Sequence, residues 1–276
     1  MLTIFRLTIR EVLNKKIFLI AGLLSIIYLL LFGTLLSYTV KGLNSYSSLS
    51  MQRAMIYQQL YSIGLYFASF LVNLFAIFIS VGTISGEVES GIMQAIVPKP
   101  IRRGEIVLGK FLGYAMVILL FGSTLFIIIA ALLKAMTGIT SPNTWSGLVL
   151  FLASPVVLLA FTVAGSTFLS TMANGIIIIM LYIIGTVGGM VEALGNLLKN
   201  TVLSNIGIVS SLVIPTDAAY RKMISVMITT SSPLDALSMT PLGAANPPST
   251  AMEIYTGIYI LTFLFLAIFI FAKKDI

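Results

Sequence analysis

The sequence GTISGEVESGIMQAIVPKPIRRGEIVLGKFLG, residues 82–113, separates two long apolar stretches and carries an unusual share of the charge in this chain. Three of the nine acidic residues lie in it: Glu87, Glu89 and Glu105. Four of the sixteen basic residues also lie in it: Lys99, Arg102, Arg103 and Lys110. Because only 9% of the chain is charged, this concentration indicates an element outside the apolar runs, which we interpret as a cytosolic docking element.

The overall composition is that of a membrane protein. Of the 276 residues, 58% are hydrophobic and the mean hydropathy is +1.08, well above the roughly half-apolar composition of soluble domains. The formal net charge is +7, but the bases lie at the ends of apolar runs, where anionic lipid and membrane topology account for them. The composition therefore predicts an all-α integral membrane protein in the lipid bilayer, with no nucleic-acid partner.

Cysteine and histidine are both absent from the sequence. Their absence excludes disulfides, metal or haem ligation through those residues, and nucleophilic sites of the Cys/His or Ser/His type. The chain also contains no Gly-x-x-x-x-Gly-Lys-Ser/Thr phosphate loop, so it is not itself an ATPase of that type. We therefore expect no catalytic residue, metal or cofactor in this chain, and an intramembrane enzyme is a weak alternative.

Six apolar runs are long enough to cross a bilayer, which takes about 20 helical residues. They cover residues 17–38, 60–84, 106–133, 145–169, 175–191 and 254–272. Together they predict a single transmembrane domain over residues 1–276. Pro155 in the fourth run is expected to kink its helix unless neighbours satisfy the freed carbonyl group.

Residues 1–16 have the pattern of an amphipathic helix that lies on the membrane surface. Leu2 and Ile9 lie on one face at helical spacing, whereas Arg6 and Arg10 lie on the other. We expect this interface helix to place its basic face among lipid head groups. A polar lead-in to the first span is the alternative.

The distribution of bases predicts that both termini are cytosolic. With six spans and the N-terminus inside, the cytosolic side receives the larger share of the bases, and these lie close to the span ends, where they influence topology most. Lys273 and Lys274, directly after the last run, agree with this orientation.

The segment 192–253 is too long and too apolar to be a simple loop. We predict outer, re-entrant or amphipathic helices there before the last span. A seventh, broken crossing is the alternative. Glu192 is the best lone candidate for a pathway residue, but we expect it to be an interfacial charge with solvent access. We expect Asp217 and Arg221 to lie in a polar helix.

Within the central stretch, residues 85–97 are predicted to form a short helix, because Pro98 and Pro100 cannot continue helical hydrogen bonding. We expect Glu87 and Glu89 to be exposed on this helix and to form part of a knob for a cleft on a partner. An ordinary cytosolic loop that carries positive charge is the alternative. A short acidic helix that ends at prolines agrees less well with an ordinary loop of this kind.

The run ISGEVESGIMQAIVPKPIRRGEIVLGKFLG, residues 84–113, resembles the loop between the second and third spans of type-2 ABC exporter permeases. That loop has an acidic Ser-Gly-Glu helix and a Lys-Pro turn, and then Arg, Glu and Gly-Lys open the next span. The basic N-terminus, the six spans and the re-entrant region resemble the family as well. At Ile92-Met93 members often have Thr-Leu, a departure that keeps the helix face apolar.

The resemblance implies that residues 85–105 form a cytosolic coupling loop fitted to a groove on an ATPase. It assigns the coupling element to Gly86, Glu87, Glu89, Ser90 and Gly91. It assigns support from the base of the third span to Arg102, Glu105 and Lys110. The interface helix, with Arg6 and Arg10, would pack beside this element.

The resemblance also implies partners and a function. Two copies of a cytosolic ABC ATPase would bind ATP and magnesium, and a second permease subunit would complete a homo- or heterodimer in the inner membrane of a prokaryote. The expected function is export of a drug, antimicrobial peptide or other amphipathic substrate. Sodium efflux by the same architecture and a non-transporting scaffold that recruits a cytosolic protein are the alternatives.

Overall fold

The computed structural model describes residues 1–44, 50–92, 103–138, 140–141, 143–227 and 248–274, and every regular element among them is helical. The helices are α1 (Leu2–Asn14), α2 (Lys16–Asn44), α3 (Ser50–Ser80), α4 (Ser85–Glu89), α6 (Arg103–Thr137), α7 (Thr144–Ser166), α8 (Thr171–Leu197), α9 (Thr201–Val213), α10 (Thr216–Met227) and α12 (Thr250–Lys273). The predicted all-α class is confirmed.

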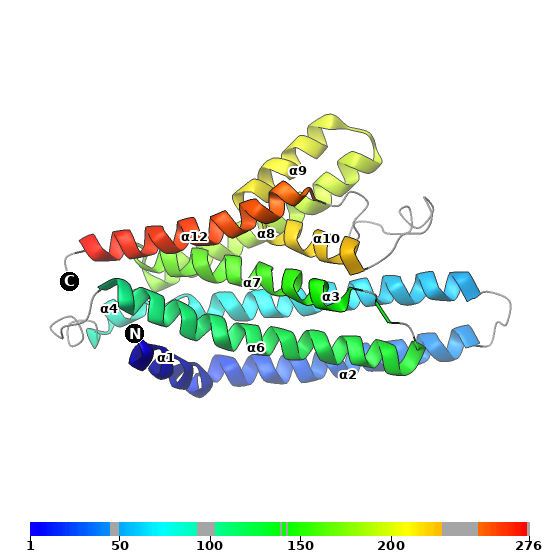
Figure 1. Cartoon of the computed structure of the whole chain (residues 1–276), viewed down its shortest axis with the longest axis horizontal. Helices are drawn as coiled ribbons and strands as arrows, with labels where there is room; N and C mark the ends of the chain where they lie inside the picture. The colour runs from blue at the N-terminus through cyan, green and yellow to red at the C-terminus, as the bar shows by residue number, and fades with distance from the viewer. Residues whose placement is uncertain (45–49, 93–102, 139, 142, 228–247, 275–276) are drawn as a thin grey trace.

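Six of the described helices are long and apolar enough to cross a membrane, which confirms the six predicted spans. They are α2, α3, α6, α7, α8 and α12, and they form an elongated bundle (Figure 1). One end of this bundle, here called the termini end, contains the start of α1, the short helix α4 and the C-terminal end of α12. The opposite end is called the far end.

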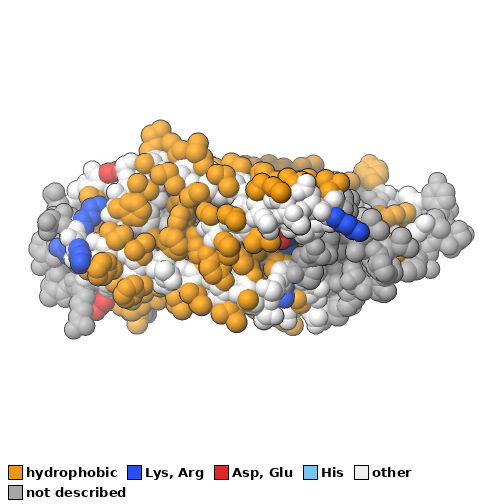
Figure 2. Space-filling view, turned by 90° about the horizontal axis from the view of Figure 1, so that it is seen from above, with side chains coloured by type: hydrophobic (Ala, Val, Ile, Leu, Met, Phe, Trp, Pro, Cys, Tyr) orange, Lys and Arg blue, Asp and Glu red, His pale blue; other side chains and the backbone are white. Residues whose placement is uncertain are grey.

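Burial divides the spans into a central and a peripheral group. In α3 and α7, 61% of the most apolar stretch is buried, against 17% in α2 and 22% in α12. Aromatic contacts fill the centre, where the Phe126 and Phe151 ring centroids lie 5.3 Å apart. Apolar side chains cover much of the surface between charged ends (Figure 2), as expected for helices that face lipid.

Pro155 lies buried inside α7, and the helix runs unbroken from Thr144 to Ser166. One residue before it, the Ser154 hydroxyl donates to Asn73 Oδ1 of α3 at 3.1 Å. The proline therefore lies where α7 is packed and hydrogen-bonded against a neighbouring span, a setting in which membrane helices tolerate proline.

The region after the fifth span begins later than predicted, because α8 continues to Leu197 rather than ending at residue 191. Close backbone contact between α8 and α9 explains the extension. A Cβ atom on Gly207 of α9 would lie only 2.6 Å from the Glu192 backbone, so only glycine permits this approach. After α9 the chain bends by 106° into α10. Counting this bent pair as one span gives up to seven crossings.

Candidate functional site

The central stretch folds back onto the bundle at the termini end. After α3, residues 81–84 form a turn that leads into α4, which ends at Glu89. Gly91 stops the helix by adopting the left-handed backbone region, with φ of 75°, a conformation that glycine accepts without steric cost. The predicted single helix over residues 85–97 is therefore wrong at its C-terminal side. Arg102 and the two prolines lie outside the described residues.

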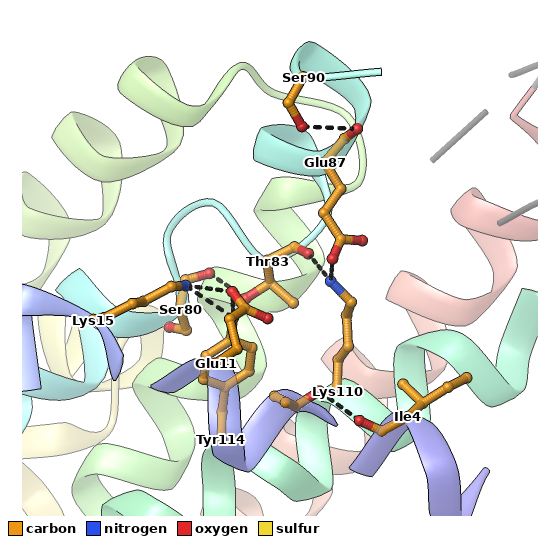
Figure 3. Close-up of polar contacts among 10 residues, drawn as sticks. Ile4, Glu11, Lys15, Ser80, Thr83, Glu87, Ser90, Lys110 and Tyr114 are labelled. Atoms are coloured by element: carbon orange, nitrogen blue, oxygen red, sulfur yellow. Dashed lines mark hydrogen bonds and ion pairs between the residues drawn. The ribbon is translucent and has the colours of Figure 1, made fainter. Parts of the chain in front are cut away.

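Glu87 of α4 forms an ion pair with Lys110 of α6 (Figure 3). The Lys110 ammonium also donates to the Thr83 carbonyl oxygen at 2.7 Å. Only 5% of the Lys110 side chain and 19% of the Glu87 side chain are exposed. The prediction that Glu87 is an exposed acid is therefore wrong, because a lysine buried in the first turns of α6 needs a nearby anion.

Glu89 is exposed, as predicted, and it caps the fifth span. Its Oε1 atom accepts a hydrogen bond from the Thr171 backbone N–H at 2.8 Å, at the first residue of α8. The hydroxyl groups of Ser85 and Thr171 lie 2.8 Å apart, which adds a second link. Since a helix N-terminus carries partial positive charge and free N–H groups, the carboxylate stabilises the start of α8.

Residues 90–92 form the part of this segment that projects outward, called here the α4 tip. Ser90 is exposed, and its hydroxyl donates to the Glu87 backbone carbonyl at 3.3 Å. The Ile92 side chain is 52% exposed. An apolar side chain at this place offers contact area to another protein, whereas the base of the segment is occupied by contacts to α6 and α8.

The N-terminal helix α1 packs on the first turns of α6. A Cβ atom on Gly113 would lie 2.7 Å from Thr8 Cβ, and one on Gly109 would lie 3.0 Å from Ile4 Cγ2. The two glycines, four residues apart, therefore let the helices touch. Arg6 and Arg10 point away from the contact and are exposed.

A lysine at the break between α1 and α2 reinforces this contact. Lys15 pairs with Glu11 at 2.7 Å and donates to the Tyr114 hydroxyl of α6 at 3.3 Å (Figure 3). Burial by itself lowers the pKa of the Lys15 ammonium, but Tyr114 and Glu11 outweigh it and raise the pKa above the ordinary value. Lys15 is therefore a fixed positive charge beside α6.

Glu105 lies in the first turn of α6, and 42% of its side chain is exposed to solvent.

Asn174 belongs to this site, although no motif in the sequence predicts it. The side-chain amide donates to the Val81 carbonyl oxygen at 2.9 Å and to that of Thr162 at 3.0 Å. It thereby joins α8, the turn after α3, and α7, and it is completely buried. Its only signal in the sequence is a position in the polar turn at residues 170–174.

A second charged cluster lies between α8 and α10, in the interior between the termini end and the far end. The Arg221 guanidinium lies 2.7 Å from Glu192 Oε2 and 2.9 Å from Asp217 Oδ2. The exposed fractions of these side chains are 7% for Arg221, 14% for Glu192 and 8% for Asp217. The prediction that Glu192 is a solvent-accessible interfacial charge is therefore wrong, because α10 folds back and brings Arg221 against it.

The short helix α4 lies at the surface and is held by two spans. The sequence of the chain also matches a known protein family. A sequence model described as ABC-2 family transporter protein matches residues 2–276. The chain belongs to this family. No curated protein shows a significant match to it.

The family model covers α1, the six candidate spans and the bent α9–α10 pair together. Membership in the family makes this chain a component of a membrane transporter, a permease that works with an ATPase subunit. In this permease the α4 segment combines an exposed tip with a base that contacts two spans.

Proposed function

We propose that this ABC-2 permease forms the translocation path of an ATP-driven exporter as a dimer, and that α4 couples it to two separate cytosolic ATPase subunits. ATP and magnesium would be bound by those partners. The observation that carries the proposal is the double attachment of α4. One attachment runs through Lys110 to α6, and the other runs through Glu89 to the first residue of α8.

The double attachment gives α4 a route by which a push on its tip would move two spans together. Lys110 is buried and bonded to both Glu87 and the Thr83 carbonyl, so α4 cannot shift without pulling on α6. Glu89 and Ser85 hold Thr171, so the same shift reaches α8. Because α8 has 27 residues, it would carry this movement over roughly 40 Å to the contacts with α9 and α10.

The orientation that agrees with this proposal places the termini end in the cytosol. Eight bases in the described residues lie on the segments that meet there: Arg6, Arg10, Lys15, Lys16, Arg103, Lys110, Lys273 and Lys274. Short basic segments beside spans remain preferentially in the cytosol. Their location supports an inner membrane protein of a prokaryote with both ends of the chain inside.

The α12 end joins the same assembly of contacts. The Lys274 ammonium donates to the Thr167 carbonyl oxygen at 2.9 Å, and Arg103 donates to the Lys274 carbonyl oxygen. Thr167 lies in the turn between α7 and α8. A movement of α4 would therefore act on a network that includes α6, α8 and α12.

For the cargo, we propose a drug, an antimicrobial peptide or another amphipathic molecule. The support is the apolar, aromatic and methionine-rich character of the spans, since such surfaces accept amphipathic ligands. The chain contains 17 Phe, 11 Tyr and 13 Met residues. The cargo proposal is tested by ATP-dependent movement of a cationic amphipathic dye in proteoliposomes that contain both subunits.

The coupling proposal is tested by co-purification in detergent with the ATPase encoded beside this permease. The informative variant is Ser90→Arg combined with Ile92→Asp, because both side chains are exposed and neither anchors α4 to a span. Glu87 is kept, since changing it would break the Lys110 pair. The matched control is Lys134→Glu, an exposed charge in the last turn of α6.

We expect the wild type and the Lys134→Glu control to retain the ATPase, and the tip variant to lose it while keeping its melting temperature. If the tip variant retains the ATPase, α4 is not the docking element. If no ATPase binds the wild type and no nucleotide-driven flux is found, the scaffold alternative replaces the exporter.

A further inference from the structure

A small polar cavity lies between α3, α8 and α10, close to the charged cluster of Arg221. It has a volume of about 10 Å³, which is close to the space that one water-sized particle needs. Its walls carry an unusual number of oxygen atoms for the interior of an apolar bundle. The contributing polar residues are Ser69 and Asn73 of α3, Tyr182 and Thr186 of α8, and Thr216 and Asp217 of α10.

Part of this wall is already fixed by hydrogen bonds. The Asn73 amide donates to the Tyr182 hydroxyl at 3.2 Å and to the Ser69 hydroxyl at 3.4 Å. The Ser154 hydroxyl of α7 donates to Asn73 Oδ1 at 3.1 Å. These bonds hold hydroxyl oxygens at the cavity, with lone pairs available to a bound species.

One wall residue has no partner. Thr216 is 2% exposed, and its hydroxyl oxygen makes no hydrogen bond among the described residues. A buried hydroxyl without a partner costs free energy. Because Thr216 lines the cavity, an occupant of that cavity would satisfy it.

The adjacent charges do not balance. Glu192 and Asp217 contribute two negative charges, and Arg221 contributes one positive charge, so one negative charge remains. Asp217 lies in the first turn of α10, and its carboxylate lies 2.9 Å from the Arg221 guanidinium. Lys222, the neighbouring base, is paired with Glu253 at 3.0 Å. A surplus charge in so little solvent requires a counter-charge.

We propose that this cavity binds one monovalent cation of about the size of sodium. One carboxylate among neutral hydroxyl and amide oxygens is a donor set that suits a hard cation of low charge. The single positive charge would balance the cluster, and the volume excludes an organic cation. The inference concerns a bound ion, and its test requires neither a transported cargo nor the ATPase.

The experiment measures thermal unfolding of the purified full chain in detergent, in NaCl, KCl or choline chloride at equal ionic strength. Radioactive sodium binding is measured on the same samples. The variants are Asp217→Asn, which removes the surplus charge, and Thr216→Val, which keeps every charge and removes the unpaired hydroxyl. Glu253→Gln is the matched control, because this carboxylate pairs with Lys222 on the partly exposed side.

We expect sodium or potassium, but not choline, to raise the melting temperature of the wild type by about 3 °C or more at saturation. Asp217→Asn should abolish the rise, and Thr216→Val should weaken the apparent affinity about tenfold. Glu253→Gln should respond as the wild type does. Thr216→Val keeps the test valid if Asp217→Asn does not fold.

Three results would each overturn the proposal. The first is an equal melting temperature of the wild type in all three salts without sodium binding, which would mean that the cavity holds water. The second is a sodium response that survives in both cavity variants. The third is stabilisation that appears only on acidification and equally in each salt, which would mean that a proton balances the charge.

Discussion

The two buried charge clusters of the bundle are built in opposite ways. At the termini end, Lys110 has one acidic partner, Glu87, and a backbone carbonyl as a second acceptor. In the interior, between α8 and α10, Arg221 has two acidic partners, Glu192 and Asp217. The first cluster is electrically neutral and fastens a short surface helix to a span. The second has a surplus negative charge and fastens the bent α9–α10 pair to α8.

This difference teaches what each cluster can do. A neutral, buried ion pair makes a stiff attachment, which suits the transfer of movement from α4 to the spans. An unbalanced cluster beside an oxygen-lined cavity depends on what occupies that cavity. Variants that unbalance either cluster should therefore have unequal costs. Two such variants test the comparison, and two further variants test the neighbouring contacts at the termini end.

The largest effect is expected for Arg221→Met. The variant leaves two carboxylates buried without their common partner, and breaking a buried pair in this way costs about 3–5 kcal/mol. The measurement is the free energy of unfolding in detergent. The matched control is Lys222→Met, whose partner Glu253 is more exposed, so its cost should be below about 1 kcal/mol. Equal costs for the two variants would contradict the buried character of the Arg221 cluster.

Lys110→Met should cost somewhat less, about 2–4 kcal/mol, because Glu87 retains some contact with solvent. The double variant Lys110→Met, Glu87→Gln should recover most of this loss, since it leaves no unpaired charge. Lys134→Met, at the other end of α6, should change little. A double variant no more stable than the single one would show that the pair is not the cause.

Gly113→Ala tests the packing contact between α1 and α6. The added Cβ atom would lie 2.7 Å from Thr8 Cβ and 3.3 Å from the Phe5 carbonyl oxygen, so we expect a cost of about 1–2 kcal/mol after the gain in helix propensity. Hydrogen exchange of the α1 amides should become faster. The control Gly33→Ala has no atom within 4 Å of the new Cβ and should be neutral or stabilising.

The smallest effect on stability is expected for Glu89→Ala, about 1 kcal/mol, because it removes one exposed cap from the start of α8. Glu89→Gln keeps an acceptor for the Thr171 amide and should cost about half as much. The specific measurement is hydrogen exchange at Thr171. Unchanged protection of this amide in Glu89→Ala would contradict the cap.

Much of the fold follows from patterns that are local in the sequence. Six apolar runs of sufficient length predict six spans, because each span must satisfy its own backbone hydrogen bonds in lipid. The periodicity of the first residues predicts α1. The helix after Ser85 was predicted, but its end was not, since the backbone at Gly91 overrides the proline signal.

The charge of a residue predicted its position in the site less reliably than hydrophobic length predicted the spans. Glu87 and Glu89 are two residues apart in one polar stretch, so the sequence treats them alike. The structure separates them, because one meets Lys110 of α6 and the other meets the start of α8. Asn174 had no signal beyond a polar turn, since its role depends on carbonyl groups from two other segments.

The sequence by itself determined the membrane class, the spans and the location of the central polar segment, because hydrophobic length and helical period are local properties. Only the tertiary structure decided which charges are buried together. Glu192 and Arg221 are 29 residues apart, and the 106° bend before α10 brings them into contact. Burial and pairing depend on how distant segments pack, and no periodicity in the sequence encodes that packing.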